Sequence, residues 1–194
     1  MLTFGYDLET TGPNPFENKI IAIHYRREGK NHIFKIWDYD DSEKDLISNF
    51  LEDWKHIPRR IDHGGDYFVT YNFRLDGPFL LTRSLLNNIG DEEWKKHLWN
   101  SIIHGPAFLD VYHLLGDELT SFEQWRKRFG LPPGKFKNSE IPQMYNERRY
   151  AEIEEYLNSE LESLETIYNV MIKEKFFLEL KEFRSTLEPE SDLD

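Results

Sequence analysis

The chain has 194 residues, of which 39% are hydrophobic and 15% aromatic, and this apolar content excludes an intrinsically disordered protein. The absence of cysteine excludes disulfides, thiolate zinc sites and a cysteine nucleophile. No apolar stretch is long enough to span a membrane and no secretory leader is recognisable, so we expect a cytoplasmic protein with one domain over residues 1–187 and an acidic, frayed tail at 188–194.

The net charge of −12 argues at first sight against a nucleic-acid partner. However, residues 151–194 hold thirteen acidic and four basic residues, a net of −9 that leaves only −3 for residues 1–150. Basic clusters lie in that earlier part, at Arg59-Arg60, Lys95-Lys96, Arg126–Arg128 and Arg148-Arg149. Binding to phosphates needs only a local basic track, so the net charge does not exclude nucleic acid, although each cluster also suits a solvated helix face.

The first part of the chain predicts three strands and one helix. Residues 1–8 alternate loosely and lead into a turn cluster that ends the strand at Gly12. Residues 19–27 and 31–37 predict two further strands, joined by a tight hairpin loop around Gly29. Residues 41–56 have the apolar spacing of an amphipathic helix, with Ser42 as its cap.

The remainder of the chain alternates strands with helices. A short strand is expected at 67–71, a helix at 78–89 closed by Gly90, and a strand at 101–109 before a helical turn at 111–115. Ser121 is expected to cap a helix over 122–129, and residues 149–183 have the spacing of one long helix, with or without a break. Three hairpin-connected strands followed by this alternation predict an α/β fold whose mixed sheet has three antiparallel strands plus parallel strands, flanked by helices.

A pair of acidic residues at the end of the first strand carries the first chemical signal. Asp7 and Glu9 stand two residues apart, so a strand projects both carboxylates to one face. Two such charges repel each other unless a cation lies between them, and hard oxygen ligands suit Mg²⁺ or Mn²⁺. The alternative is a solvated strand end. Thr10, Thr11 and Gly12 favour the site, because small residues let another backbone approach closely.

The segment Tyr6–Gly12 resembles the first motif of the DnaQ-like 3′-5′ exonuclease superfamily, Asp-x-Glu-Thr-x-Gly. Asn72–Asp76 resembles the second motif, with Leu75 in place of the usual aromatic residue; the alternative for Asp76 is a helix cap. Tyr156–Glu160 resembles the third motif of the tyrosine (DEDDy) subgroup, with Glu160 where the family has Asp. Phe108–Asp110 and 129–132 are similar to exonuclease domains of family B DNA polymerases and their free-standing archaeal and bacterial relatives.

The resemblance covers roughly residues 2 to 170, and it implies a ribonuclease-H-like fold and an exonuclease. The enzyme would remove nucleoside 5′-monophosphates from the 3′ end of single-stranded nucleic acid, DNA more readily than RNA. Two divalent ions, Mg²⁺ or Mn²⁺, would be bridged by Asp7. The resemblance further implies metal ligands at Asp7, Glu9, Asp76 and Glu160, a water-orienting hydroxyl at Tyr156, and substrate contacts at Leu8, Thr10, Asn72 and Phe79.

Several alternatives stay open at this point. Glu160 is one methylene longer than the family's Asp, a displacement of about 1.5 Å, so a catalytically impaired protein that binds nucleic acid or acts as a scaffold is the main rival. An enzyme that cuts internally is a second. His113 and Asp117 offer a competing third motif at the wrong spacing. Arg74 and Arg83 are candidates for binding phosphates, and apolar residues over 176–183 suit either internal packing or self-association.

Overall fold

The computed structural model describes residues 2–54, 67–96, 99, 108–111 and 121–173. Within them, five strands form one mixed sheet in the order β3-β2-β1-β4-β5. β2 pairs antiparallel with β1 and β3, whereas β4 pairs parallel with β1 and β5. This topology confirms the predicted α/β class and the mixed sheet. The strands are β1 (Leu2–Thr10), β2 (Ile20–Arg27), β3 (Lys30–Lys35), β4 (Tyr67–Thr70) and β5 (Phe108–Asp110).

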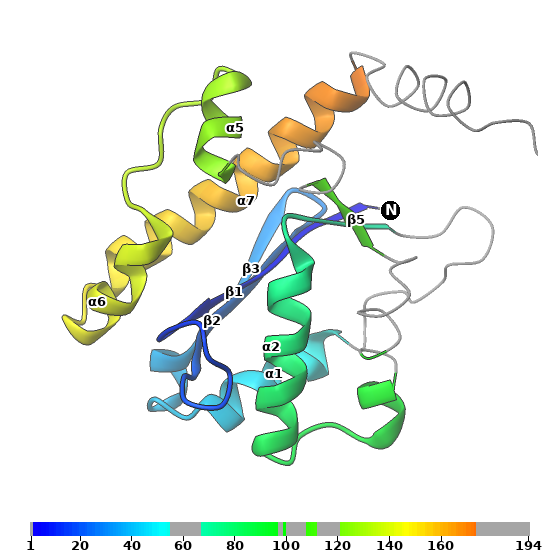
Figure 1. The fold of residues 1–194 in the computed structure, drawn as a ribbon, viewed down its shortest axis with the longest axis vertical. Helices are drawn as coiled ribbons and strands as arrows, with labels where there is room; N and C mark the ends of the chain where they lie inside the picture. The colour runs from blue at the N-terminus through cyan, green and yellow to red at the C-terminus, as the bar shows by residue number, and fades with distance from the viewer. Residues whose placement is uncertain (1, 55–66, 97–98, 100–107, 112–120, 174–194) are drawn as a thin grey trace, which may run out of the picture.

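Helices cover the sheet on both sides. In Figure 1, α7 lies on one side of the strands together with α5 and α6, and α1 and α2 lie on the other. Consecutive side chains of β2, from Ile20 to Tyr25, are all buried, which requires that both faces of this strand are covered. The helices are α1 (Glu43–Trp54), α2 (Phe73–Leu86), α5 (Phe122–Arg128), α6 (Ile141–Asn146) and α7 (Tyr150–Lys173), with short 3₁₀ turns η1 (Ile36–Tyr39) and η2 (Asn138–Glu140).

The hairpin between β2 and β3 forms as the sequence predicts. Its two loop residues, Glu28 and Gly29, have positive φ angles of 52° and 73°, the conformation of a type I′ turn that matches the twist of the strands. The predicted extension of β3 to residue 37 is wrong. After Lys35 the chain enters η1, whose end is closed by Asp40 in the left-handed conformation, and this turn redirects the chain toward α1.

A bulge in β1 lies just before the acidic pair. The register with β2 shifts between Phe4 and Asp7, and Gly5 within this shift has a φ of +67°. A Cβ atom on Gly5 would stand 2.3 Å from Cδ2 of Leu161 in α7. The missing side chain therefore leaves room for the Leu161 side chain of α7 to pack against the strand immediately before Asp7.

Gly5→Ala is expected to lower the free energy of unfolding by about 1–3 kcal/mol, since it combines a strained φ with a clash against α7. In a thermal scan this corresponds to roughly 2–4 °C per kcal/mol for a chain of this size. Gly29→Ala is the matched control, because Gly29 has a similar φ of +73° but nothing within 4 Å of its would-be Cβ. Equal losses for the two variants would contradict the packing of Leu161 against Gly5.

Helix α2 begins earlier than the sequence predicts, at Phe73 rather than at Pro78. The carboxylate of Asp110, at the end of β5, accepts the backbone N–H groups of Asn72 at 2.8 Å and Phe73 at 3.0 Å, and so caps the helix from a neighbouring strand. The residue before Pro78 is Gly77, which has no Cβ to clash with the proline ring. As a result, Asp76 lies inside the first turns of α2.

The later helices follow the prediction in type, with two differences. Ser121 and Gln124 form the capping box that starts α5, and α7 runs without a break over its described length. The turn η2 and helix α6 were not predicted. The expectations for residues 101–107, 112–115, 174–183 and 188–194 lie outside the described residues. No helix in the described part is both long and apolar enough to cross a membrane.

Candidate metal and substrate site

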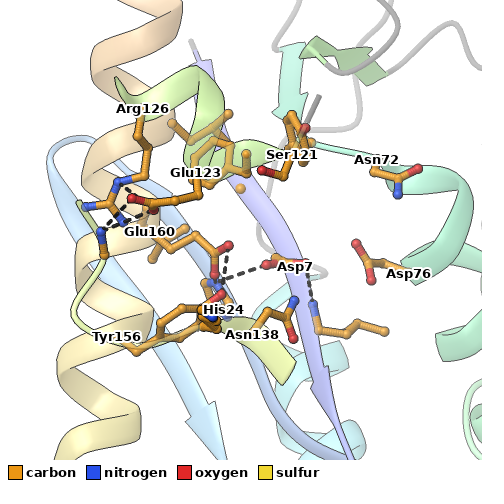
Figure 2. Close-up of a pocket in the computed structure, with 18 of the residues that line it drawn as sticks. Asp7, His24, Asn72, Asp76, Ser121, Glu123, Arg126, Asn138, Tyr156 and Glu160 are labelled. Carbon is orange, nitrogen blue, oxygen red and sulfur yellow. Dashed lines mark hydrogen bonds and ion pairs between the residues drawn. The ribbon is translucent and has the colours of Figure 1, made fainter. Parts of the chain in front are cut away.

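A cavity of about 910 Å³ opens where β1, the start of α2 and α7 converge. It continues toward α5 and the segment 134–139. Figure 2 shows acidic side chains from all three elements directed into one space. Among its lining residues are Asp7 and Leu8 from β1, Asn72 and Asp76 from the start of α2, and Tyr156 and Glu160 from α7.

His24 of β2 lies at the base of this space, directly opposite Asp7 in the strand pairing. Its Nε2 atom is 3.7 Å from Oδ2 of Asp7 and 3.7 Å from Oε2 of Glu160. The hydroxyl of Tyr156 donates a hydrogen bond to Oε1 of Glu160 at 3.2 Å. Tyr156 and Glu160 are four residues apart, so one face of α7 presents both.

Glu9 and Asp76 complete an acidic cluster with Asp7 and Glu160. Glu9 is 1% exposed, and its Oε1 atom has no hydrogen-bond partner among the described residues. Oε2 of Glu160 likewise has none there. Asp7 of β1 and Asp76 of α2 line the same cavity, so α2 brings its acid close to the acidic pair of β1. Four acids from three separate elements thus meet in one place.

The pKa values show how strongly this cluster resists full ionisation. Burial raises the pKa of Asp7 to about 7, and the charge of Glu160 adds to the rise while His24 opposes it. Burial also raises the pKa values of Glu9 and Asp76, and in both the charge of Asp7 contributes further. The pKa of Glu160 is raised by burial as well. At neutral pH these groups therefore need a positive charge between them to ionise together.

The residues present fit a divalent cation. Asp7, His24 and Glu160 each offer one ligand atom, and these atoms lie within 4.8 Å of one another, so the group can hold a metal ion. Among the described residues, His24 is the only basic side chain within 4.0 Å of a carboxylate oxygen of the four acids, and burial lowers its pKa, which favours the neutral imidazole. Unpartnered carboxylate oxygens without a nearby lysine or arginine ion pair are typical of cation ligands.

The structure places only some of the residues predicted to contact substrate along the cavity. Leu8 and Asn72 line the cavity, and the N–H of Leu8 donates to Oδ1 of Asp7 at 3.0 Å. The hydroxyl of Thr10 donates instead to the carbonyl of Gly12 at 2.8 Å and closes the turn after β1. Phe79 is 8% exposed and packs in the hydrophobic core rather than along the cavity.

The two arginines that are candidates for binding phosphates have different surroundings. The guanidinium of Arg83 holds the buried carboxylate of Glu43 through contacts of 2.5 to 3.1 Å, and Glu43 in turn accepts the backbone N–H of Ile20 at 2.7 Å. This ion pair ties α1, α2 and β2 together, so the prediction that Arg83 binds phosphate is wrong. Arg74 is exposed on α2. The competing residue His113 lies outside the described part of the chain.

Two cavity residues were missed by sequence reasoning. His24 is a polar residue within the buried strand β2, and its position across from Asp7 is visible only once the strand register is known. Arg126 is 4% exposed, donates from Nη2 to the Pro132 carbonyl at 2.9 Å and to Oγ of Ser159 at 3.1 Å, and lowers the pKa of Glu160 by its charge. Its sequence signal was a basic cluster that equally suits a solvated helix.

Comparison with known proteins adds one distant relative. A protein of uncharacterized function from Methanocaldococcus jannaschii is 25% identical over 181 residues, which cover 86% of this chain and 93% of the relative. No family model matches the chain. The similarity extends over nearly the whole of both chains, so the two proteins correspond in length as well as in sequence.

Proposed function

We propose that this protein is a metal-dependent 3′-5′ exonuclease that hydrolyses single-stranded nucleic acid, DNA more readily than RNA. The observation that carries the proposal is that Asp7, Asp76 and Glu160 line one cavity, while the buried carboxyl of Glu9 lies close enough for the charges of Glu160 and Asp7 to raise its pKa. These acids are far apart in sequence, and the motif resemblance selected them before any spatial information. A chance resemblance gives no reason for the three segments to converge.

The sheet gives separate support. A ribonuclease-H-like fold has three hairpin-connected antiparallel strands followed by parallel strands, and the order β3-β2-β1-β4-β5 has this arrangement. In open α/β sheets, ligands bind at the carboxyl ends of strands, next to the point where strand order reverses. Asp7 and Glu9 lie toward that end of β1, beside the start of α2, which follows β4.

The chain's own groups divide the work of phosphodiester hydrolysis. The four acids would hold divalent ions, which would activate a water and offset the negative charge on the phosphoryl oxygens. Tyr156 stays protonated, because burial raises its pKa well above the ordinary value. Its hydroxyl therefore orients the attacking water and does not remove a proton from it. Attack of water on the terminal phosphorus breaks the bond to the 3′ oxygen, which leaves with a proton on the shortened strand. The released product is a nucleoside 5′-monophosphate.

The cavity suits an unpaired strand end. Leu8, Phe122 and Phe136 give it apolar and aromatic walls on which bases can stack, and Arg126 and Lys137 add positive charge. Leu75, which replaces the family's aromatic residue, lines the cavity and is 67% exposed. An exposed apolar side chain at the rim is available for contact with a base.

The proposal is tested with single-stranded oligonucleotides labelled at the 5′ end, in Mg²⁺, Mn²⁺ or EDTA. We expect a ladder that shortens from the 3′ end, mononucleotide products, no reaction in EDTA, and protection by a blocked 3′ terminus. Binding without turnover in both metals would favour the impaired binding protein instead. Cleavage of a strand blocked at both ends would favour an internal nuclease. Matched DNA and RNA substrates measure the preference between them.

Tyr156→Phe is expected to lower kcat by about 10²-fold, the size of effect found when one positioned hydrogen-bond donor is removed, while KM changes little. The fold should lose only about 0.5–1.5 kcal/mol, the worth of one hydrogen bond. Tyr145→Phe is a matched control, because the Tyr145 hydroxyl also bonds a carboxylate, Asp41 at 2.8 Å, away from the cavity. Equal activity in the two variants would remove Tyr156 from the proposed mechanism.

A further inference from the structure

His24 has a chemical role that the acidic cluster alone does not explain. It is fully buried, and neither ring nitrogen has a hydrogen-bond partner among the described residues. A buried imidazole without hydrogen bonds is costly unless another group satisfies it. Its Nε2 atom faces the oxygens of Asp7 and Glu160 at equal distances of 3.7 Å. The three atoms therefore surround one small space.

The spacing of these three atoms matches one shared ion. Ligands bound at about 2.0–2.2 Å to a single first-row ion stand roughly 3.0–3.6 Å apart. The observed 3.7 Å separations require only a small contraction to reach this range. Glu160 contributes to the fit, because its extra methylene relative to aspartate extends the carboxylate toward β2. One metal position thus explains both Glu160, where the resembled motif has aspartate, and the buried His24, whose ring nitrogens have no hydrogen-bond partner among the described residues.

We propose that His24 is a ligand, with Asp7 and Glu160, of one metal position in this cavity, and that its nitrogen makes this position select a first-row transition-metal ion such as Mn²⁺ over Mg²⁺. Mg²⁺ strongly favours oxygen ligands, whereas imidazole suits transition ions. The inference rests on the proposed metal-dependent function, and it adds the identity of a ligand and the preference of the site.

The experiment uses the full-length protein without an affinity tag, MnCl₂ at less than one equivalent, and no nucleic acid. Electron spin-echo envelope modulation of the bound Mn²⁺ detects coupling to a directly ligated imidazole nitrogen. We expect this coupling in the parent protein and in His32→Gln, whose histidine lies on β3 away from the cavity. We expect its loss in His24→Gln.

Competition titrations measure the preference itself. Loss of even an outer partner of a metal ligand weakens binding by about 10- to 100-fold, so His24→Gln should weaken Mn²⁺ by at least about tenfold while Mg²⁺ changes less. The ratio of Mn²⁺ to Mg²⁺ affinity should fall accordingly. His24→Asn is a second variant of smaller volume, for use where the glutamine variant does not fold.

The outcomes separate the two proposals. Bound Mn²⁺ without nitrogen coupling in the parent protein overturns the role of His24 and leaves the metal-dependent exonuclease intact. Coupling that persists in a folded His24 variant also overturns it, because the nitrogen then belongs to another histidine. Failure of the parent protein to bind Mn²⁺ overturns the role of His24, and failure to bind either Mn²⁺ or Mg²⁺ overturns both proposals.

Discussion

Asp7→Asn is expected to lower the rate of metal-dependent mononucleotide release by at least about 10²–10³-fold, the cost of removing one group that stabilises charge in the transition state. Asp7 belongs with His24 and Glu160 to the group that can hold a metal ion, and it lines the cavity together with Asp76, so it is the centre of the cluster. Asparagine keeps the shape of the side chain but removes the negative charge. Quenched-reaction assays on a 3′-terminal single strand in Mn²⁺ measure the loss.

The same variant distinguishes loss of the site from loss of the fold. The charge of Asp7 raises the pKa values of Glu9 and Asp76, so its removal relieves repulsion in the metal-free protein. We therefore expect the melting temperature in EDTA at about pH 8 to be equal to or higher than that of the parent protein. Asp45→Asn, on the exposed surface of α1, is the control and should leave both quantities unchanged. Parental activity in Asp7→Asn would refute the assigned site.

Local signals were sufficient for most of the elements. The β2–β3 hairpin followed from a short loop with a glycine, and the start of α5 from the spacing of Ser121 and Gln124, because each signal acts within a few residues. The start of α2 could not be predicted in this way. It depends on the carboxylate of Asp110, which lies far along the chain and reaches Asn72 only through the pairing of β4 with β5.

The candidate site shows the same contrast between residues that local sequence signals predict and residues that depend on long-range contacts. Asp7, Glu9, Asp76, Tyr156 and Glu160 were predicted from motif resemblance. Four of them line the cavity, and Glu9 is buried beside it rather than among the lining residues. Nothing in the sequence distinguished His24 from other histidines, since its significance comes from the register that sets it opposite Asp7. Phe79 shows the converse error in reasoning from position. Its place after the second motif suggested substrate, yet the helical spacing of α2 directs it to the core.

In the metal-free protein, the free energy of unfolding is expected to fall by at least about 2 kcal/mol between about pH 5 and about pH 8, since each unit of pKa shift is worth about 1.4 kcal/mol. Burial raises the pKa of Asp7 from 3.8 to about 7 in the folded protein, and those of Glu9, Asp76 and Glu160 are raised in the same direction. The folded state thus retains protons that the unfolded chain has released. This contribution to stability is complete below about pH 4 and is lost as the pH rises through about 7.

The pH range of this experiment is chosen with two other sets of titrating groups in mind. Burial lowers the pKa of His24 below 6.5, so this residue acts in the opposite direction, but it is one group against four acids. The pKa values of Glu147 and Glu152 are lowered from 4.5 by hydrogen bonds with Gln143 and Arg149, and they therefore affect stability only at more acidic pH. Chemical denaturation in EDTA between about pH 5 and about pH 8 isolates the acidic cluster.

Divalent ions should reverse the loss at the alkaline end of this range. An ion that binds only the folded protein adds about 2.7 kcal/mol at a free concentration one hundred times its Kd, and it binds best where the carboxylates are ionised. Mn²⁺ should therefore stabilise the protein more at about pH 8 than at about pH 5, and the pH dependence in EDTA should be shallower in Asp7→Asn. If the free energy of unfolding rose with pH in EDTA, or if Mn²⁺ did not change it at about pH 8, the four acids would not form a cation site. Because the fold tolerates such repulsion in its interior, the acidic cluster favours a role in ligand binding over a role in stability.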